Sequence, residues 1–348
     1  MKPPSGKWHL KKRGLSFLLC FVLMLSMAAC KPSSGEAPAA LSPVPSVEET
    51  TPVPDYAQPV AYVWQPYVLS ELYRGLYGDA FVADYKAMID AFLSYETTFP
   101  CADAETVTAL NAVAPSCFPL LYMDVGYVQY DEVNQVGLLS YALPEAAHFA
   151  GIEAFKQSVS QFITENVMRS DSACTTALAL YMAFSARVRY DYAALDTDVL
   201  VDVSPYRALT TYEGICQSFG PAYAYLCLQT GIEAVSAGGL STDDTAHAWT
   251  LVELDGSYFY MDPTYENGEG GLGLKYFGMT SAERVSAGNY IEEFINVGDC
   301  NLLWGPDITV DDTRFSALHT VALAEINRAQ QQIDCTNADG TVWSFPLD

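Results

Sequence analysis

The spacing of apolar residues changes along the chain, and the changes predict where helices and strands lie. Residues 68–96 carry apolar side chains at helical spacing, which predicts one or two helices. Residues 117–143 alternate and are rich in Tyr, Val and Leu, so they predict strands. A short helix is predicted over 146–167. These elements indicate an N-terminal α+β subdomain, which we assign to residues 57–168.

Two further helices are predicted in the middle of the chain. Leu180, Phe184 and Val188 recur at every fourth residue, which predicts an amphipathic helix that starts near Ser172. A second helix begins around residue 216 and stops at Gly231, a residue type that favours a helix C-terminus. Its predicted buried face consists of Ile215, Phe219, Ala222, Tyr223 and Leu226.

Strands follow the second helix, and one turn between them sets their register. The Asp-Gly dipeptide at 255–256 separates two alternating runs, which is a strong signal for a two-residue hairpin turn. With this turn, Trp249 faces Asp262 and His247 faces Thr264. His247, Trp249 and Asp262 then share one face, and His247 and Asp262 are diagonal neighbours roughly 7–8 Å apart at the backbone. A three-residue loop would reverse the parity and separate the two side chains.

The C-terminal part of the chain has a helical pattern over 311–334 and a strand pattern over 340–345. We assign residues 169–290 to a core that contains the two central helices and the hairpin, and residues 291–348 to a C-terminal extension. The sequence has no internal repeats.

The first 29 residues have the pattern of a signal peptide. Five basic residues precede the apolar run "LSFLLCFVLMLSM", which is too short to span a bilayer. The run ends in "MAAC", the arrangement of a lipobox, so we expect Cys30 to receive a diacylglyceryl group and become the new N-terminus. The alternative is ordinary cleavage after Ala29, which leaves a free thiol. Residues 30–56 are rich in Pro, Ser, Ala and Glu and predict a disordered tether.

This pattern predicts an exported protein that is held at a membrane by its lipid. The membrane is either the outer face of a bacterial cytoplasmic membrane or one that faces a periplasm. Without the five basic residues of the signal peptide, 12 of the 17 basic residues remain against 42 acidic ones, a formal net charge of −30. So large a negative charge argues against nucleic acid as a partner.

Metal and cofactor motifs are absent from the sequence. The acidic residues form no calcium-loop pattern, no C-x-x-C pair indicates zinc, and the Gly-rich "YENGEGGLG" lacks a P-loop lysine. His148 and His319 lie in helical patterns without clustered acidic or thiol partners. We therefore expect no metal and no cofactor.

Seven cysteines remain once Cys20 leaves with the signal peptide and Cys30 is assigned to lipid. An odd number in an exported protein suggests that one thiol has a separate task. Proximity favours disulfides between Cys101 and Cys117 and between Cys300 and Cys335, although six cysteines allow fifteen pairings.

Cys216 is the best candidate for the separate thiol. A thiol at a helix N-terminus is stabilised as a thiolate by the helix dipole and the free N–H groups, and a neighbouring protonated histidine lowers its pKa further. Gly214 leaves room for backbone to approach. His247 and Asp262 on one face can serve this thiol, because the carboxylate orients the imidazole. The alternative is that Cys216 is a buried apolar residue and His247 an ordinary strand residue.

These residues resemble a known family. "GICQSFGPAYAYLCLQTGI", the glycines at 238–239, "HAWTLVELDGSYFYMDPTY" and "KYFGM" are similar to the core of the transglutaminase-like superfamily, and the upstream "ARVRYDY" resembles the helix end that precedes it. The resemblance covers about residues 171–280. It implies an α+β fold related to papain-like cysteine proteases, with a nucleophile helix packed on an antiparallel sheet. It also implies Cys216 as nucleophile, His247 as general acid/base and Asp262 as the orienting group.

Two residues depart from the family pattern. Ser218 stands where many relatives have Gly. Pro221 lies inside the nucleophile helix, where it removes one backbone hydrogen bond, so we expect the helix to start late or to kink.

Several residues are candidates to line the site. The backbone N–H of Cys216 is one expected oxyanion donor, and Tyr206 and Gln217 are candidate side-chain donors. Trp249 is expected to form a wall of the cleft beside His247.

The expected activity is cleavage or transfer of amide bonds in a peptide or protein substrate. Attack by the thiolate would give a thioester, which either water (a peptidase or amidase) or an amine (a transamidase) resolves. Hydrolysis is favoured because water is always available outside the cell and no amine site is visible. The alternative is an inactive fold that acts as a surface binding or assembly module.

Overall fold

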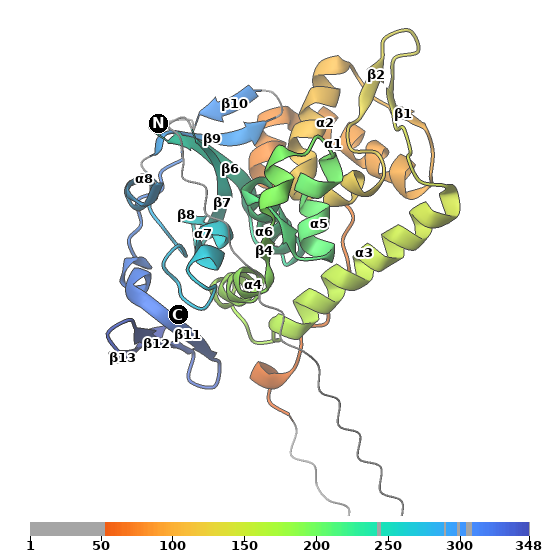
Figure 1. Ribbon diagram of the computed structural model, residues 1–348. Helices are drawn as coiled ribbons and strands as arrows, with labels where there is room; N and C mark the ends of the chain where they lie inside the picture. The colour runs from red at the N-terminus through yellow and green to blue at the C-terminus, as the bar shows by residue number, and fades with distance from the viewer. Residues whose placement is uncertain (1–52, 242–244, 289, 298–299, 304–307, 348) are drawn as a thin grey trace, which may run out of the picture. The chain divides into compact units, whose positions relative to one another are not determined.

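An antiparallel five-stranded sheet, ordered β10-β9-β6-β7-β8, lies at the centre of the fold (Figure 1). Its strands are Ala234–Ser241 (β6), Ala246–Leu254 (β7), Ser257–Met261 (β8), Tyr290–Val297 (β9) and Cys300–Leu303 (β10). The helix α6, Cys216–Gln229, packs on β6 and β7. The predicted α+β class, with a helix packed on an antiparallel sheet, is confirmed.

The structure is a computed structural model that describes residues 53–241, 245–288, 290–297, 300–303 and 308–347. All of them belong to one compact unit, Pro52–Asp348. The predicted signal peptide, Cys30 and most of the predicted tether lie outside the described residues. Within the described ranges, no helix is both long and apolar enough to cross a membrane. The domain boundaries at 57, 169 and 291 stay predictions.

The packing of α6 on β7 depends on a glycine. A Cβ atom at position 220 would stand 2.8 Å from the backbone oxygen of Trp249, so only Gly220 permits this approach. Thr250 of β7 donates a hydrogen bond to the Gly220 oxygen at 2.7 Å. The five residues predicted for the apolar face of α6 are all buried, and Gly231 follows the helix with a φ of 80°, so both predictions are confirmed.

A second helix, α4 (Ala173–Arg187), packs against α6. Its N-cap is Ser172, whose side chain accepts a hydrogen bond from the Thr175 N–H, and this confirms the predicted start. The Tyr223 hydroxyl of α6 donates to the Ala177 oxygen of α4 at 2.8 Å. The other elements of this region are β4 (Arg189–Tyr190), α5 (Pro205–Thr210), β5 (Glu213–Gly214), α7 (Pro263–Gly268) and α8 (Ser281–Gly288).

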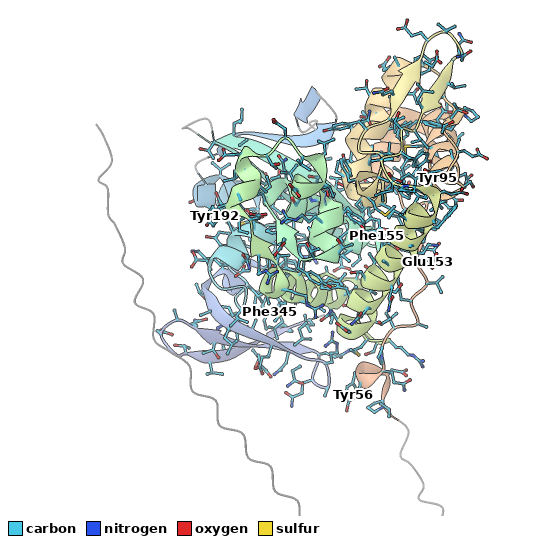
Figure 2. All side chains as sticks on the ribbon, turned by 45° about the vertical axis from the view of Figure 1, so that its right-hand side comes forward. Tyr56, Tyr95, Glu153, Phe155, Tyr192 and Phe345 are labelled. Atoms are coloured by element: carbon cyan, nitrogen blue, oxygen red, sulfur yellow. The ribbon has the colours of Figure 1, made fainter. Side chains whose placement is uncertain are left out.

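Three helices and a small sheet precede the core. The helices are α1 (Glu71–Leu93), which is kinked at Gly78, α2 (Ala104–Cys117) and α3 (Glu145–Asn166). The sheet has the order β1-β3-β2, with β1 at Thr98–Pro100, β2 at Gln129–Asp131 and β3 at Val136–Leu138. The predicted α1 and α3 are confirmed, whereas α2 was not predicted. On α3, Phe155 is buried and Glu153 is exposed (Figure 2).

The strands predicted over 117–143 are only partly confirmed. β2 and β3 are short, and Pro119–Met123 forms a 3₁₀ helix, η2, instead of a strand. Pro119 cannot donate a ladder hydrogen bond, and the three residues after it are all buried in succession rather than alternately. The apolar run is therefore covered by packing on all sides and not by pairing in a sheet.

The helix predicted over 311–334 is wrong. After a 3₁₀ turn at Ser316–Thr320 (η5), this segment forms the antiparallel strands β11 (Val321–Asn327) and β12 (Gln332–Asn337). The final strand, β13 (Val342–Pro346), pairs with β12 and confirms the predicted last strand. Ala, Glu and Gln favour a helix locally, but pairing across the sheet overrides that weak preference.

The predicted disulfides are wrong. Cys101 precedes α2 and Cys117 ends it, so a 14-residue helix separates them. At a rise of about 1.5 Å per residue, that spacing far exceeds the Cα separation of about 7 Å that a disulfide tolerates. Both are free, and Cys335 is also free, whereas the side chain of Cys300 lies outside the described residues.

Candidate active site

Cys216 is the first residue of α6, so its thiol lies at the free N–H groups of a helix N-terminus. The preceding Ile215 is extended, and its N–H donates to Ser218 Oγ at 3.2 Å. A Cβ at position 214 would lie 2.6 Å from the same oxygen, which explains Gly214. Ser218 therefore caps the helix. α6 begins at Cys216 and continues through Pro221, so the predicted late start is wrong.

The hairpin that carries His247 has the predicted turn. Asp255 and Gly256 both have positive φ, 54° and 81°, as a two-residue type I′ turn requires, and the predicted register is confirmed. β8 ends one residue before Asp262, which instead becomes the N-cap of α7. Thr264 consequently lies in α7 and not opposite His247, so that pairing was wrong.

His247 and Asp262 are brought together by this arrangement. His247 Nε2 lies 2.7 Å from Asp262 Oδ2, and Asp262 Oδ1 accepts the Tyr265 N–H at 3.0 Å. The Cys216 thiol shares a hydrogen bond with the His247 side chain. Because Nε2 is occupied by the carboxylate, Nδ1 is the ring nitrogen left for the thiol. One chain of hydrogen bonds thus runs from Cys216 through His247 to Asp262.

Arg284 of α8 is a further part of the site that sequence reasoning missed. Its Nη1 lies 3.1 Å from Asp262 Oδ2, and both side chains are fully buried. The guanidinium also lies over the rings of Trp249 and Tyr265, 4.2 and 4.9 Å from their centroids. Asp262 is therefore held between a histidine and an arginine, and no local motif around residue 284 signals this contact.

The charges of the site shift the pKa values of Cys216, His247 and Asp262. Burial alone would raise the pKa of the Cys216 thiol, but its hydrogen bond to His247 and the charge of that ring bring the pKa below its usual value. Burial alone would lower the pKa of His247, yet Asp262 and Cys216 raise it to about 9. Burial opposes ionisation of Asp262 as well, but the charges of His247 and Arg284 hold its pKa below the usual range. The shifts favour a thiolate, an imidazolium and a carboxylate.

The pKa of every other described thiol is raised instead of lowered. Burial raises the pKa of Cys174 and Cys335 to about 11, and that of Cys117 and Cys227 to about 12. Burial also raises the pKa of Cys101. Among the described cysteines, Cys216 alone has a lowered pKa.

The region around this site matches a known family. Residues 158–263 match the family model of the transglutaminase-like superfamily, a range that begins in α3 and contains Cys216, His247 and Asp262. The chain carries a transglutaminase-like domain. A comparison of the whole sequence with curated proteins found no match.

Two solved structures are similar to parts of the chain. One, a proposed cysteine protease from Cytophaga hutchinsonii, is 19% identical over 32% of this chain and 37% of that chain, with a TM-score of 0.26. The other, a TGase, is 14% identical over 35% of this chain and 34% of that chain, with a TM-score of 0.28. The chain spans about a third of the length of each of them.

The remaining predicted residues of the transglutaminase-like domain do not all reach the thiol. Trp249 packs beside His247, with ring centroids 5.8 Å apart, but it is fully buried and forms no cleft wall. The ring of Tyr206 stacks on Phe155 of α3 at 5.6 Å. Gln217 is exposed and lines a cavity beside α6. The donor roles of Tyr206 and Gln217 stay predictions.

Two tyrosines near the thiol and the imidazole were also missed as site residues. Tyr265 stacks on His247, with centroids 4.4 Å apart and an interplanar angle of 21°. Tyr190 pairs with Gly214 in the β4–β5 ladder, and burial followed by the charge of Cys216 raises its pKa to about 12. Their only signals were the "DPTY" and "ARVRYDY" stretches, which contain them.

The other described histidines each have one acidic partner, which the sequence did not indicate. His148 Nδ1 lies 2.8 Å from Asp124 Oδ2, and His319 Nδ1 lies 3.5 Å from Glu283 Oε1. Over the described ranges, however, no three His, Cys, Asp or Glu side chains gather in a way that could hold a metal ion.

Proposed function

We propose that the transglutaminase-like domain is an enzyme in which Cys216 attacks amide carbonyl groups of peptide or protein substrates, with His247 as general acid/base and Asp262 as the orienting group. The supporting observation is the chain of hydrogen bonds from the Cys216 thiol through His247 to the buried Asp262. A nucleophile in contact with a base that a third group orients is the arrangement of nucleophilic acyl transfer.

The reaction starts from the thiolate–imidazolium pair. Sγ of Cys216 bonds to the carbonyl carbon, and the carbonyl π electrons move to the oxygen. The C–N bond then breaks, and the imidazolium of His247 gives its proton to the departing amine. A thioester and a neutral histidine remain. Asp262, hydrogen-bonded at Nε2, stabilises the imidazolium that precedes this step.

The oxyanion of the intermediate needs hydrogen-bond donors. The backbone N–H of Cys216 is the proposed donor, because the first N–H groups of α6 have no partner within the helix. Gln217, exposed at the next position, is the side-chain candidate that lies nearest in sequence.

Water is the proposed acceptor of the acyl group. Neutral His247 takes a proton from water, the hydroxide oxygen bonds to the thioester carbon, and the Cys216 thiolate leaves. Turnover in ¹⁸O-labelled water with an added primary amine tests this step. Hydrolysis places ¹⁸O in the released carboxylate, whereas an amide of the added amine would instead establish a transamidase.

Alkylation by iodoacetamide at pH 7 tests the proposed nucleophile. Cys216 should react at least tenfold faster than Cys174, the other partly exposed described thiol, because an unassisted thiol is only a few per cent ionised at this pH. His247→Ala should remove that advantage. Equal, slow labelling of Cys216 in both proteins would favour the alternative, an inactive surface binding or assembly module.

The proposed location is the outer face of a bacterial membrane, held by lipid on Cys30. Its support is the sequence pattern of residues 1–30. Metabolic labelling with a fatty acid should mark the wild-type protein and not Cys30→Ser, which should be released from membranes. Membrane retention of the unlabelled variant would contradict lipid anchoring.

A further inference from the structure

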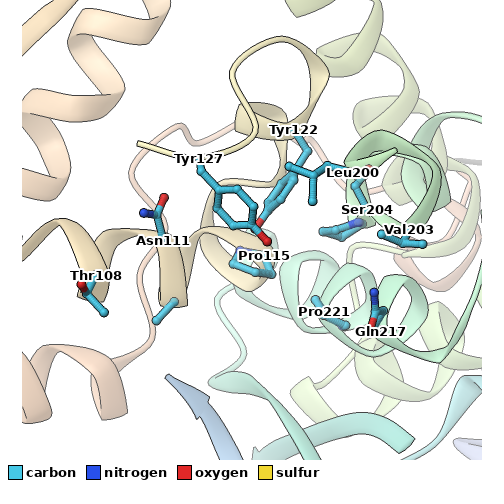
Figure 3. Close-up of a pocket in the computed structure, with 12 residues that line it drawn as sticks. Thr108, Asn111, Pro115, Tyr122, Tyr127, Leu200, Val203, Ser204, Gln217 and Pro221 are labelled. Atoms are coloured by element: carbon cyan, nitrogen blue, oxygen red, sulfur yellow. The ribbon is translucent and has the colours of Figure 1, made fainter. Parts of the chain in front are cut away.

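A cavity of about 620 Å³ lies beside the N-terminal part of α6 (Figure 3). Gln217 and Pro221 of α6 line one side of it, and Pro115 of α2 lines another. Tyr122, Tyr127 and Leu200 contribute large side chains to the lining. None of the lining residues is charged. A volume of this size accommodates a large side chain with its adjoining backbone.

The cavity is close to the candidate nucleophile. Gln217 directly follows Cys216, so their Cα atoms are about 3.8 Å apart. Gln217 and Pro221 are four residues apart and share one face of α6. The cavity therefore borders the first turns of the helix that carries the Cys216 thiol.

The wall opposite α6 is held in place by contacts within the protein. The amide of Asn111 on α2 holds the backbone of Val128 through two hydrogen bonds, of 2.9 and 2.8 Å, next to Tyr127. Gly126 has a φ of 76°, and a Cβ there would lie 3.1 Å from Leu200 Cδ1. Tyr122 and Tyr127 meet edge to face, with centroids 6.3 Å apart. Tyr127 is nevertheless 50% exposed, so an apolar surface remains open.

The segment that precedes Leu200 of the lining is acidic. Leu200 begins the 3₁₀ helix η4 (Leu200–Val203), and the segment before it contains the 3₁₀ helix η3 (Tyr192–Asp196). Asp196 and Asp198 are exposed, and within the described part of the chain neither forms an ion pair. Tyr192 on the same segment is 76% exposed (Figure 2). Exposed carboxylates beside an uncharged cavity complement a ligand that is apolar at one position and basic at the next.

We propose that this cavity is a substrate subsite: it receives a large apolar side chain of a peptide near the attacked amide bond, while a basic residue of the same peptide lies along Asp196 and Asp198. This inference rests on the proposed function and names its substrate class. It also assigns a task to the region before the core, since α2, η2 and Tyr127 together supply half of the lining.

Peptide binding to the full chain in detergent tests the subsite independently of turnover. Cys216→Ala is used so that no peptide is consumed, and the dissociation constants of three peptides are compared. A peptide with adjacent Phe and Lys should bind at least tenfold more tightly than peptides with Gly in place of Phe or Glu in place of Lys. Equal dissociation constants would overturn the proposal.

Substitutions of cavity residues test which side chains produce the two peptide preferences. Tyr127→Ala and Leu200→Ala should each abolish the preference for Phe over Gly, and the double variant Asp196→Asn/Asp198→Asn should abolish the preference for Lys over Glu. Val133→Ala, at an 89% exposed position of the β2–β3 hairpin, is the matched control and should keep both preferences. Retention of the Phe preference in both cavity variants would overturn the assignment.

Alkylation separates this proposal from the one on which it rests. Tyr127→Ala in the otherwise wild-type chain should leave the iodoacetamide rate of Cys216 within twofold, because the reagent is too small to need the subsite. Fast alkylation with no peptide preference would overturn the subsite alone. Slow alkylation of the wild-type protein would overturn the proposed enzyme, whatever the peptides do.

Discussion

Two buried histidine–aspartate pairs are found among the described residues, and their surroundings differ. In the core, His247 Nε2 contacts Asp262 at 2.7 Å; in the N-terminal region, His148 Nδ1 contacts Asp124 at 2.8 Å. His148 uses its second nitrogen on the backbone oxygen of Phe92, also at 2.8 Å. His247 instead presents its second nitrogen to a thiol. The two pairs thus consist of the same residue types but differ in the group that contacts the second ring nitrogen.

The two pairs also differ in the solvent exposure of the histidine. His148 is 0% exposed and lies among the rings of Phe92, Tyr95, Tyr141 and Phe149, whereas His247 is 9% exposed. Asp124 also accepts the backbone N–H groups of Ala142 and Leu143. The His148 pair therefore ties α1, α3 and two loops together. Of these two pairs, only the His247 pair combines a thiol partner with partial exposure.

The largest expected difference between the pairs is in the pH dependence of Cys216 alkylation. His247 is protonated below about pH 9, so it should support the thiolate at pH 6, and that support should be lost as the pH rises through about 9. His247→Ala should slow alkylation about 100-fold at pH 6, where an unassisted thiol is less than about 1% ionised. At pH 10 the two rates should agree within about threefold. A constant ratio across this range would contradict the ion pair, and folded His148→Ala should match the wild type throughout.

For the free energy of unfolding, His148 should matter more than His247. His148→Ala leaves Asp124 buried without its side-chain partner, so the free energy of unfolding should fall by about 3–5 kcal/mol. His247→Ala should cost only about 1–3 kcal/mol, because Asp262 keeps Arg284. Urea denaturation of both variants measures the two losses. Equal losses would show that Arg284 does not compensate for the missing imidazole.

The smallest effect is expected at Arg284, which only the core pair possesses. The pKa of Asp262 lies below its usual value, so the carboxylate stabilises the site at neutral pH, and this contribution is lost as the pH falls through that pKa. Arg284→Gln should raise the pKa and move the acid limb of the alkylation profile upward by about one pH unit. Arg74→Gln, which breaks an exposed pair with Glu71, is the control and should not move the limb. An unmoved limb in Arg284→Gln would make the arginine purely structural.

The core of the fold was more predictable than its flanks. The helix that starts after Ser172, the helix that starts at Cys216 and the Asp-Gly turn all have local signals: a cap, a spacing of apolar residues and two positions of positive φ. In residues 311–334 the local preference was helical, and strands formed because β12 pairs on both sides. Local patterns fail where the partner that decides the structure is distant in sequence.

Two features of the site could be predicted from local patterns: the turn parity that puts His247 and Asp262 on one side of the hairpin, and Cys216 as a thiol at a helix start. Both follow from turn chemistry and residue spacing, which act over a few residues. The partner of the second nitrogen of each histidine, and the contact of Arg284 with Asp262, depend instead on how the chain packs. So does the wall of the cavity that α2 builds beside α6. These contacts join elements far apart in the chain, and they exist because packing brings buried charges to partners that can offset their loss of water.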